Sequence, residues 1–221
     1  MHIYKMKGFT LAEVLITLGI IGIIAALTLP NLIYNYKKSV VETRLQKVYS
    51  VMNQAVMLSE VENGDKKDWY EMFPASSLDW YNTYLAKYIK STRVVNNSGA
   101  ITIYFADGSA LAQGNPAHIR DWLFYPGGNP EKCNSKYSSP VGRCVFMFLF
   151  QPTSVVDPGY IYHYDKGFEP YKYSWDGTEA GLYSGYGGCE TATAFPGAYC
   201  STLIQYNGWK IPDDYPFKVS Y

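Results

Sequence analysis

The feature that most constrains this chain is an apolar run of 21 residues from Phe9 to Leu29, in which Glu13 is the one ionisable side chain. As an α-helix the run is about 30 Å long, which matches the hydrocarbon core of a bilayer. The alternatives are a cleavable signal peptide, for which Ala25-Ala26-Leu27 imitates a cleavage site, and a buried core helix. The length of the run and Glu13 disfavour a signal peptide, and nothing later in the chain is apolar enough to enclose a core helix. We therefore expect a membrane span.

The carboxylate inside this run needs an explanation, because a charge at the centre of a bilayer costs about 3 kcal/mol. One explanation is that Glu13 lies near the membrane surface, where it reaches water or becomes protonated. The other is that a positive group meets Glu13 inside the lipid. A cut between Gly8 and Phe9 creates such a group, an amino terminus one helical turn before Glu13. This amine can pair with Glu13 within one chain or between neighbouring chains.

The segment Lys7-Gly8-Phe9-Thr10-Leu11-Ala12-Glu13 resembles the processing motif of type IV pilins and type II secretion pseudopilins. The resemblance implies that a prepilin peptidase removes a basic leader after Gly8 and N-methylates the new terminal residue, Phe9. It also implies that Glu13 neutralises the N-terminus of a neighbouring subunit in a filament. The segment therefore predicts a subunit that is processed and then polymerised.

Other positions bear on the same resemblance. Pro30 falls where the family commonly kinks its helix, whereas Ala12 replaces a residue that is more often a larger aliphatic one. The resemblance places the leader in the cytoplasm and the globular part outside it. The positive-inside rule does not decide the orientation, because basic residues flank both ends of the span. These residues are Lys5 and Lys7 before the span and Lys37, Lys38, Arg44 and Lys47 after it.

The resemblance also implies partners and a location. The partners are the prepilin peptidase, other pilin or pseudopilin subunits, membrane lipid and, indirectly, an inner-membrane platform protein and an assembly ATPase. The location is the inner membrane, as a single-pass protein, and then a periplasmic or cell-surface fibre. Basic and acidic side chains balance at 19 each, so we expect no nucleic acid partner. The alternatives are a minor tip subunit with an adhesive or DNA-uptake role and an anchored domain that does not polymerise.

Beyond Pro30 the helical pattern resumes, with apolar residues at spacings of three and four. The stripe consists of Val41, Leu45, Val48, Met52 and Ala55, and charged residues flank it at Lys38, Glu42, Lys47 and Glu60. Asn63-Gly64 supplies a helix stop signal. We therefore expect one helix from about Phe9 to Val61, roughly 80 Å long, which presents its stripe to a sheet.

The rest of the chain predicts an α+β domain with a pilin-like fold. A short helix is expected over residues 76–89, and a β-hairpin over Ile101–Phe105 and Ala110–Ala112, joined through Asp107-Gly108. Further strands are expected at His118–Tyr125 and Cys144–Phe150. Glycine and proline punctuate the chain from Pro152 onward, which indicates ordered loops, and Trp209 and Ile211 suggest a last short strand. The segment from Cys200 to Pro216 also resembles the ends of pilin-like proteins of the type II secretion class.

The expected organisation therefore has four parts. Residues 1–8 are a cleaved leader, and residues 9–29 are the transmembrane half of the helix. Residues 30–62 are its amphipathic half, and residues 63–221 are an extracytoplasmic globular domain.

Four cysteines, Cys133, Cys144, Cys189 and Cys200, fall in two successive pairs that are each 11 positions apart. Three connectivities are open, and we favour Cys133–Cys144 with Cys189–Cys200 because short loops close easily. Disulfides suit a loop-rich region outside the cytoplasm. A zinc site is the alternative, and the lack of a Cys-x₂-Cys pair disfavours it.

The remaining candidates for chemistry are weak. His118 and His163 have no nucleophile or metal partner at a motif spacing, so we expect a protein that is not an enzyme. Asp213-Asp214 suggests calcium, but no spaced acidic loop surrounds the pair, and a solvated turn is favoured. We therefore expect no cofactor. The dense tyrosines also suit a sugar-binding or adhesive surface, but we favour aromatic packing of loops and subunit contacts.

Overall fold

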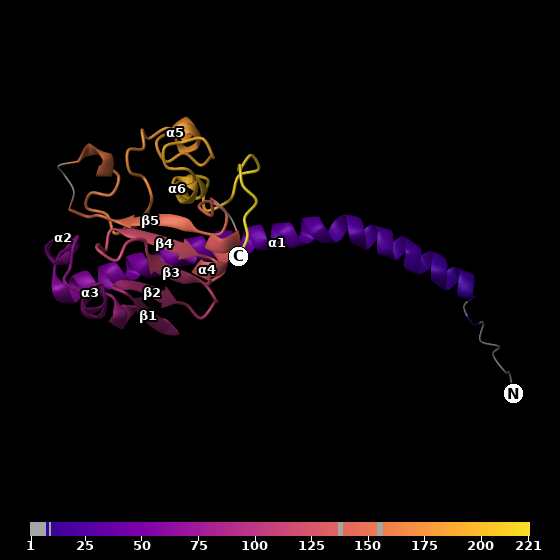
Figure 1. Cartoon of the computed structure of the whole chain (residues 1–221), viewed down its shortest axis with the longest axis horizontal. Helices are drawn as coiled ribbons and strands as arrows, with labels where there is room; N and C mark the ends of the chain where they lie inside the picture. The colour runs from indigo at the N-terminus through magenta and orange to yellow at the C-terminus, as the bar shows by residue number, and fades with distance from the viewer. Residues whose placement is uncertain (1–7, 9, 137–138, 154–156) are drawn as a thin grey trace. The chain divides into compact units, whose positions relative to one another are not determined.

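A computed structural model describes residue 8 and residues 10–136, 139–153 and 157–221. The chain divides into two compact units, Met1–Lys37 and Lys38–Tyr221, and the first helix contributes to both (Figure 1). The helices are α1 (Leu11–Asn63), α2 (Lys66–Trp69), α3 (Ser77–Tyr84), α4 (Pro130–Lys136), α5 (Glu179–Ser184) and α6 (Cys200–Tyr206), with 3₁₀ turns at Ala86–Tyr88 and Pro158–Tyr160. The strands are β1 (Arg93–Asn97), β2 (Ala100–Tyr104), β3 (Ala110–Gln113), β4 (Asp121–Tyr125), β5 (Phe146–Phe150) and β6 (Phe168–Pro170).

The long helix ends where the sequence predicts. It continues to Asn63, and Gly64 follows with a φ of 81°, a conformation that glycine adopts without a Cβ penalty. All five residues of the predicted stripe are buried (Val41, Leu45, Val48, Met52 and Ala55). The second part of α1 therefore supplies a wall of the hydrophobic core, as expected.

One residue beside the stripe departs from the prediction. Glu42 is only 6% exposed, although we expected it on the solvated flank. Its Oε2 accepts from the Lys210 ammonium at 2.9 Å and its Oε1 from the backbone N–H of Ile211 at 3.0 Å. Both partners lie almost 170 positions later in the chain, so no local pattern reveals them.

The strands form one antiparallel sheet in the order β1-β2-β3-β4-β5-β6. The predicted hairpin is confirmed, because β2 pairs with β3 and Ile103 lies opposite Leu111. Every residue of β5 is buried, since both faces of the sheet are covered at this strand. On one face Phe148 stacks on Phe168 at 4.9 Å, and on the other Met147 and Leu149 belong to a cluster with residues of α6. These elements confirm an α+β fold with a long N-terminal helix.

Three local expectations are wrong. The helix expected over residues 76–89 stops at Tyr84 and gives way to a 3₁₀ turn. The last strand expected at Trp209 and Ile211 is absent from the described residues, because Trp209 has a φ of 64° within a turn. The region after Pro152 contains not only loops but also β6, α5 and α6.

Candidate processing and assembly site

The residues of the processing motif lie at the beginning of α1. Gly8 is exposed, and a Cβ built on it meets no atom within 4 Å, so the backbone there is open. Phe9 and residues 1–7 lie outside the described residues. The geometry of the motif is therefore that of Gly8, Thr10 and the residues that follow.

Thr10 and Glu13 form a reciprocal cap at the start of the helix. The carbonyl of Thr10 accepts the first helical hydrogen bond, from the N–H of Val14 at 3.2 Å, which makes Thr10 the N-cap residue. Its Oγ1 accepts from the N–H of Glu13 at 3.2 Å. In return, Oε2 of Glu13 accepts from the N–H and the hydroxyl of Thr10, both at 2.8 Å. This is the geometry of a capping box, in which two unpaired backbone donors of the first turn are satisfied.

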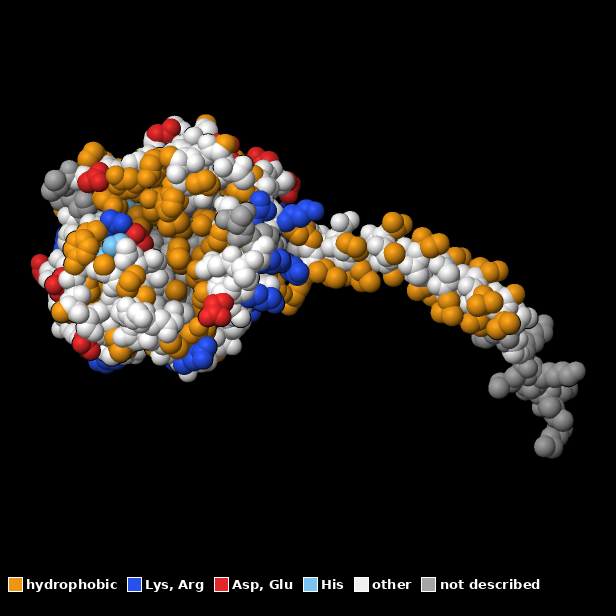
Figure 2. Space-filling model, in the orientation of Figure 1, with side chains coloured by type: hydrophobic (Ala, Val, Ile, Leu, Met, Phe, Trp, Pro, Cys, Tyr) orange, Lys and Arg blue, Asp and Glu red, His pale blue; other side chains and the backbone are white. Residues whose placement is uncertain are grey.

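The helix after the cap is apolar and exposed within its own unit. Figure 2 shows hydrophobic side chains along it, and Leu11, Leu15 and Ile23 are each more than 60% exposed. The hydroxyls of Thr17 and Thr28 donate to helix carbonyls at Val14 and Ile24, so these polar groups are satisfied internally. By length and composition, α1 is able to cross a membrane. Glu13 is the one charged side chain of α1 before Lys37.

Pro30 lies inside α1, and the helix continues through it. Proline removes one helical N–H and crowds the carbonyl four residues earlier, which is Ala26 here. Membrane helices tolerate this loss. The kink therefore stays a prediction.

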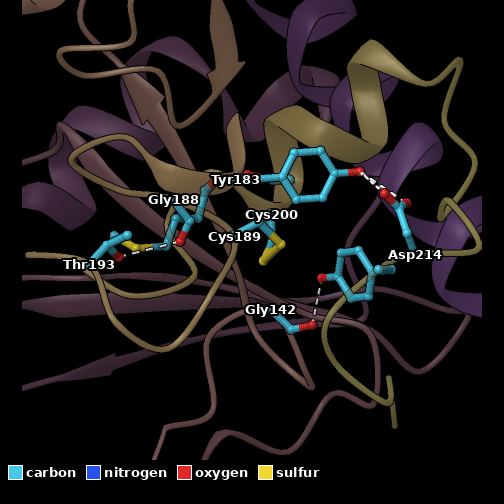
Figure 3. Close-up of a disulfide and its surroundings, with 10 residues drawn as sticks. Gly142, Tyr183, Gly188, Cys189, Thr193, Cys200 and Asp214 are labelled. Carbon is cyan, nitrogen blue, oxygen red and sulfur yellow. Dashed lines mark hydrogen bonds between the residues drawn. A yellow bond between two sulfur atoms is a disulfide. The ribbon is translucent and has the colours of Figure 1, made fainter. Parts of the chain in front are cut away.

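The structure joins Cys133 to Cys144 and Cys189 to Cys200, which are the pairs favoured from the sequence. The second disulfide lies in a core cluster that also contains Leu149 of β5 (Figure 3). Near it, the hydroxyl of Tyr183 donates to the carboxylate of Asp214 at 3.0 Å. Burial and this carboxylate raise the pKa of Tyr183 to about 12. The loops around β5 are thus held by covalent and polar contacts together.

The C-terminal segment is fastened to α1 by several contacts. Besides the contacts of Glu42, Lys38 of α1 lies 3.5 Å from the carboxylate of Asp213. The ring of Tyr49, also on α1, lies 5.0 Å from that of Trp209. The Asp213-Asp214 pair thus contacts a lysine and a tyrosine of the same chain. These contacts explain how a segment without regular structure is positioned.

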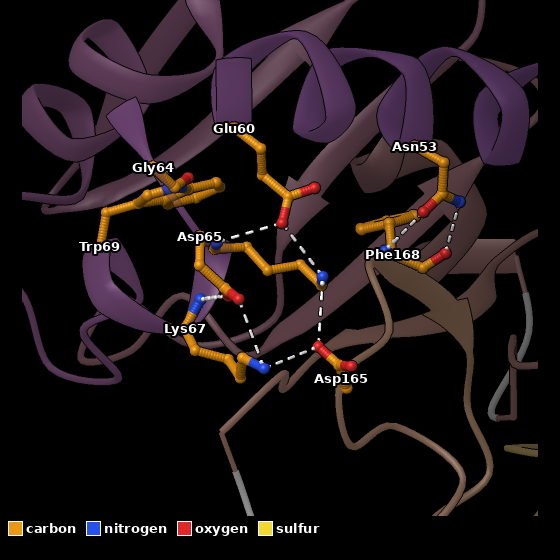
Figure 4. A network of polar contacts seen from close by, with 9 residues as sticks. Asn53, Glu60, Gly64, Asp65, Lys67, Trp69, Asp165 and Phe168 are labelled. Atoms are coloured by element: carbon orange, nitrogen blue, oxygen red, sulfur yellow. Dashed lines mark hydrogen bonds and ion pairs between the residues drawn. The ribbon is translucent and has the colours of Figure 1, made fainter. Parts of the chain in front are cut away.

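A second polar network fastens the loop before β6 to the end of α1 (Figure 4). Lys66 lies between Glu60 at 3.1 Å and Asp165 at 3.4 Å, and Lys67 contacts Asp65 and Asp165. The hydrogen bond from Lys67 and the charge of Lys66 lower the pKa of Asp165. This network stabilises the loop that leads into the edge strand of the sheet.

The two candidate histidines are buried among other side chains. His163 is fully buried, and its Nε2 accepts from the N–H of Lys172 at 3.1 Å. Burial, with the nearby charge of Lys172, lowers the pKa of His163 to about 3. His118 lies 3.4 Å from the carboxylate of Asp121, which is itself bound by the guanidinium of Arg120. Each histidine therefore contacts a neighbour that anchors it in the fold.

Two of these sets of contacts were not expected from the sequence. The first is the cap, for which the Thr10-x-x-Glu13 spacing before an apolar run is a readable signal. The hydrogen bonds of Glu42 with Lys210 and Ile211 have no such signal in the sequence.

Comparison with known family models gives two matches. Residues 3–29 match the prokaryotic N-terminal methylation motif, and residues 31–219 match a family of unknown function, DUF6613. No curated protein and no solved structure matches the chain.

The methylation motif, the apolar helix behind it, the antiparallel sheet and the two disulfides define a type IV pilin-like protein. Proteins of this class are structural subunits, and they associate with other pilin subunits. The chain itself belongs to the DUF6613 family, because the model of that family matches nearly all residues after the methylation motif.

Proposed function

We propose that this protein is a fibre subunit that is cut between Gly8 and Phe9, N-methylated at Phe9 and polymerised. The observation that carries the proposal is the methylation motif, which places Glu13 in the first turn of an exposed apolar helix. The helix anchors the unprocessed chain in the inner membrane, with the globular part outside the cytoplasm. The disulfides fit that location, because such bonds persist outside the reducing cytosol.

Assembly follows from the charge of Glu13. In the single chain, both described hydrogen bonds to its carboxylate reach Oε2 and come from Thr10. Neither donor is positively charged, so the described residues supply no charge that compensates the carboxylate. The amino terminus of a neighbouring subunit supplies the opposite charge. Assembly is therefore favourable, because a separated subunit leaves the Glu13 carboxylate in lipid without a positive partner.

Of the two kinds of fibre, we propose a type II secretion pseudopilus rather than a type IV pilus. The support is the resemblance of the segment from Cys200 to Pro216 to endings of that class. Such a subunit works with a prepilin peptidase, a platform protein and an assembly ATPase.

The test separates the charge of Glu13 from its role in the cap. Glu13→Gln keeps a capping partner for Thr10 and removes the charge, whereas Thr10→Val removes the cap and keeps the charge. In a host with a prepilin peptidase, we expect both variants to insert in the membrane. We expect crosslinking between subunits to fall at least about tenfold in Glu13→Gln, a cost typical of an unpaired buried charge, and to persist in Thr10→Val.

The intact mass of the mature chain tests processing separately. We expect it to begin at Phe9 and to carry a single methyl group. Equal crosslinking of Glu13→Gln and the wild type would contradict the assembly mechanism. A chain that keeps its leader would contradict the processing step.

A further inference from the structure

The two edge strands of the sheet, β6 and β1, differ in whether their outward backbone groups have hydrogen-bond partners. At the β6 edge, the side-chain amide of Asn53 binds the backbone of Phe168 in both directions: Nδ2 donates to the carbonyl at 2.8 Å, and Oδ1 accepts from the N–H at 2.9 Å. Asn53 thus occupies the position that another strand would take (Figure 4). Two residues further on, Pro170 has no N–H to offer. This edge is closed to a further strand.

The β1 edge has the opposite character. β1 and β2 join through a two-residue turn at Ser98 and Gly99, with φ values of 51° and 97°, as in a type I′ hairpin. In such a hairpin Asn97 exchanges hydrogen bonds with β2, so alternation directs the N–H and C=O of Val94 and Asn96 away from the sheet. No described contact pairs these outward groups. Each residue of β1 is at least partly exposed.

The chain segment that leads into and forms this edge strand is basic. Between Asp79 and Asp107 the chain has no acidic residue, whereas it has three basic ones, Lys87, Lys90 and Arg93. Lys87 is paired with Glu62 of α1, and the guanidinium of Arg93 lies 4.0 Å over the ring of Tyr104. Arg93 and Lys90 are exposed and lie at the start of the open strand. The strand therefore favours a partner with negative charge.

The two faces of β1 differ in chemistry. By register, Val94 shares the core-side face with its partner Ile103, while Arg93 shares the other face with Tyr104. On that second face Arg93 and Glu131 of α4 both line a polar groove of about 430 Å³. An added strand would thus place one set of side chains beside Val94 and the alternate set beside Arg93.

We propose that the β1 edge binds an extended acidic segment of a protein partner by strand addition. The outward groups of Val94 and Asn96 form the main-chain hydrogen bonds, and Arg93 pairs with a carboxylate of the segment. Apolar residues of the segment lie beside Val94. A second copy of β1 fits less well, because it would bring two basic edges together. This contact is separate from the fibre contacts of α1 and does not depend on them.

The first experiment measures binding of a labelled octapeptide in which Glu and Val alternate, using the full chain in detergent. An octapeptide of alternating Lys and Val is the matched control. We expect the acidic peptide to bind at least about tenfold more tightly than the basic one. In the wild-type chain, hydrogen exchange should slow at the amides of Val94 and Asn96 when the acidic peptide is present. Equal binding of the two peptides, or no protection at these amides, would overturn the proposal.

Variants then locate the contact. Val94→Pro removes one outward N–H, and we expect it to weaken binding of the acidic peptide about tenfold, whereas Val94→Thr keeps the N–H and the binding. Arg93→Gln should weaken the acidic peptide and leave the basic peptide unchanged. Hydrogen exchange on the wild-type chain decides the matter if Val94→Pro does not fold. Dimerisation through β1, seen by sedimentation and lost in Val94→Pro, would show a second copy to be the occupant and would overturn the proposal.

Discussion

At the scale of single residues, Glu13 satisfies two different needs with one carboxylate. Its position in the first helical turn completes a capping box with Thr10. Its negative charge also interacts favourably with the positive end of the helix dipole. Neither role requires a neighbour, so the residue is compatible with the single chain. Among the residues that the structure describes, no positively charged side chain contacts Glu13 in this apolar stretch. The cap explains why the helix begins there, and the charge is what the proposed association uses.

The buried histidine predicts how stability depends on pH. The pKa of His163 is lowered to about 3 in the folded chain, while an unfolded histidine titrates near pH 6.5. Between these values the unfolded state binds more protons, so acidification destabilises the fold. We expect the free energy of unfolding to fall by up to about 1.4 kcal/mol for each unit by which the pH drops below the pKa of an unfolded histidine.

The measurement is urea unfolding of the full chain at neutral and mildly acidic pH, before the carboxylates titrate. His163→Gln keeps an acceptor for the N–H of Lys172 and should show a shallower pH dependence. His118→Gln is the matched control: burial also lowers the pKa of His118, but the charge of Asp121 opposes the shift. A His163→Gln variant with the wild-type pH dependence would show that this prediction is wrong.

At the scale of elements, the two disulfides have different surroundings, and this difference predicts their order of reduction. Cys189 and Cys200 are fully buried, whereas Cys133 and Cys144 retain a few per cent of exposure and line a cavity of about 220 Å³. A thiol reductant must reach a sulfur atom in order to attack it. We therefore expect Cys133–Cys144 to be reduced first in the folded chain.

Alkylation during a reductant titration, followed by peptide mapping, measures this order. In the urea-unfolded chain both disulfides close loops with the same sequence separation, so we expect similar reduction there. Earlier reduction of Cys189–Cys200 in the folded chain would contradict the role of burial.

Elements with strong local signals were predictable from the sequence, and the others depend on distant contacts. The buried stripe of α1 and the β2–β3 hairpin carry clear periodicity and turn residues. In helix α6 even the polar residues Ser201 and Thr202 are buried, so its pattern does not separate a core face from a solvent face, and β6 has three residues and ends in proline. For the site, the motif locates Glu13, and the Thr10-x-x-Glu13 spacing is the local signal for its cap. The burial of Glu42 required knowledge of a segment near the other end of the chain.

At the scale of the whole molecule, one helix is built for two environments. Before Lys37 its large apolar side chains are exposed, as lipid or neighbouring helices require. From Val41 to Ser59 one face is buried within the globular unit. The same element thus combines an exposed apolar segment with a part of the core.

Two truncations test this division of α1. Residues 38–221 contain every residue of the buried stripe, so we expect them to fold without the apolar half. Residues 62–221 lack six buried apolar side chains of α1. Their burial is worth on the order of 10 kcal/mol, which is comparable to the whole stability of a domain. We expect circular dichroism and urea unfolding to show a cooperative transition for the longer fragment and none for the shorter. A folded shorter fragment would mean that the sheet and its disulfides suffice, and that α1 is only an anchor.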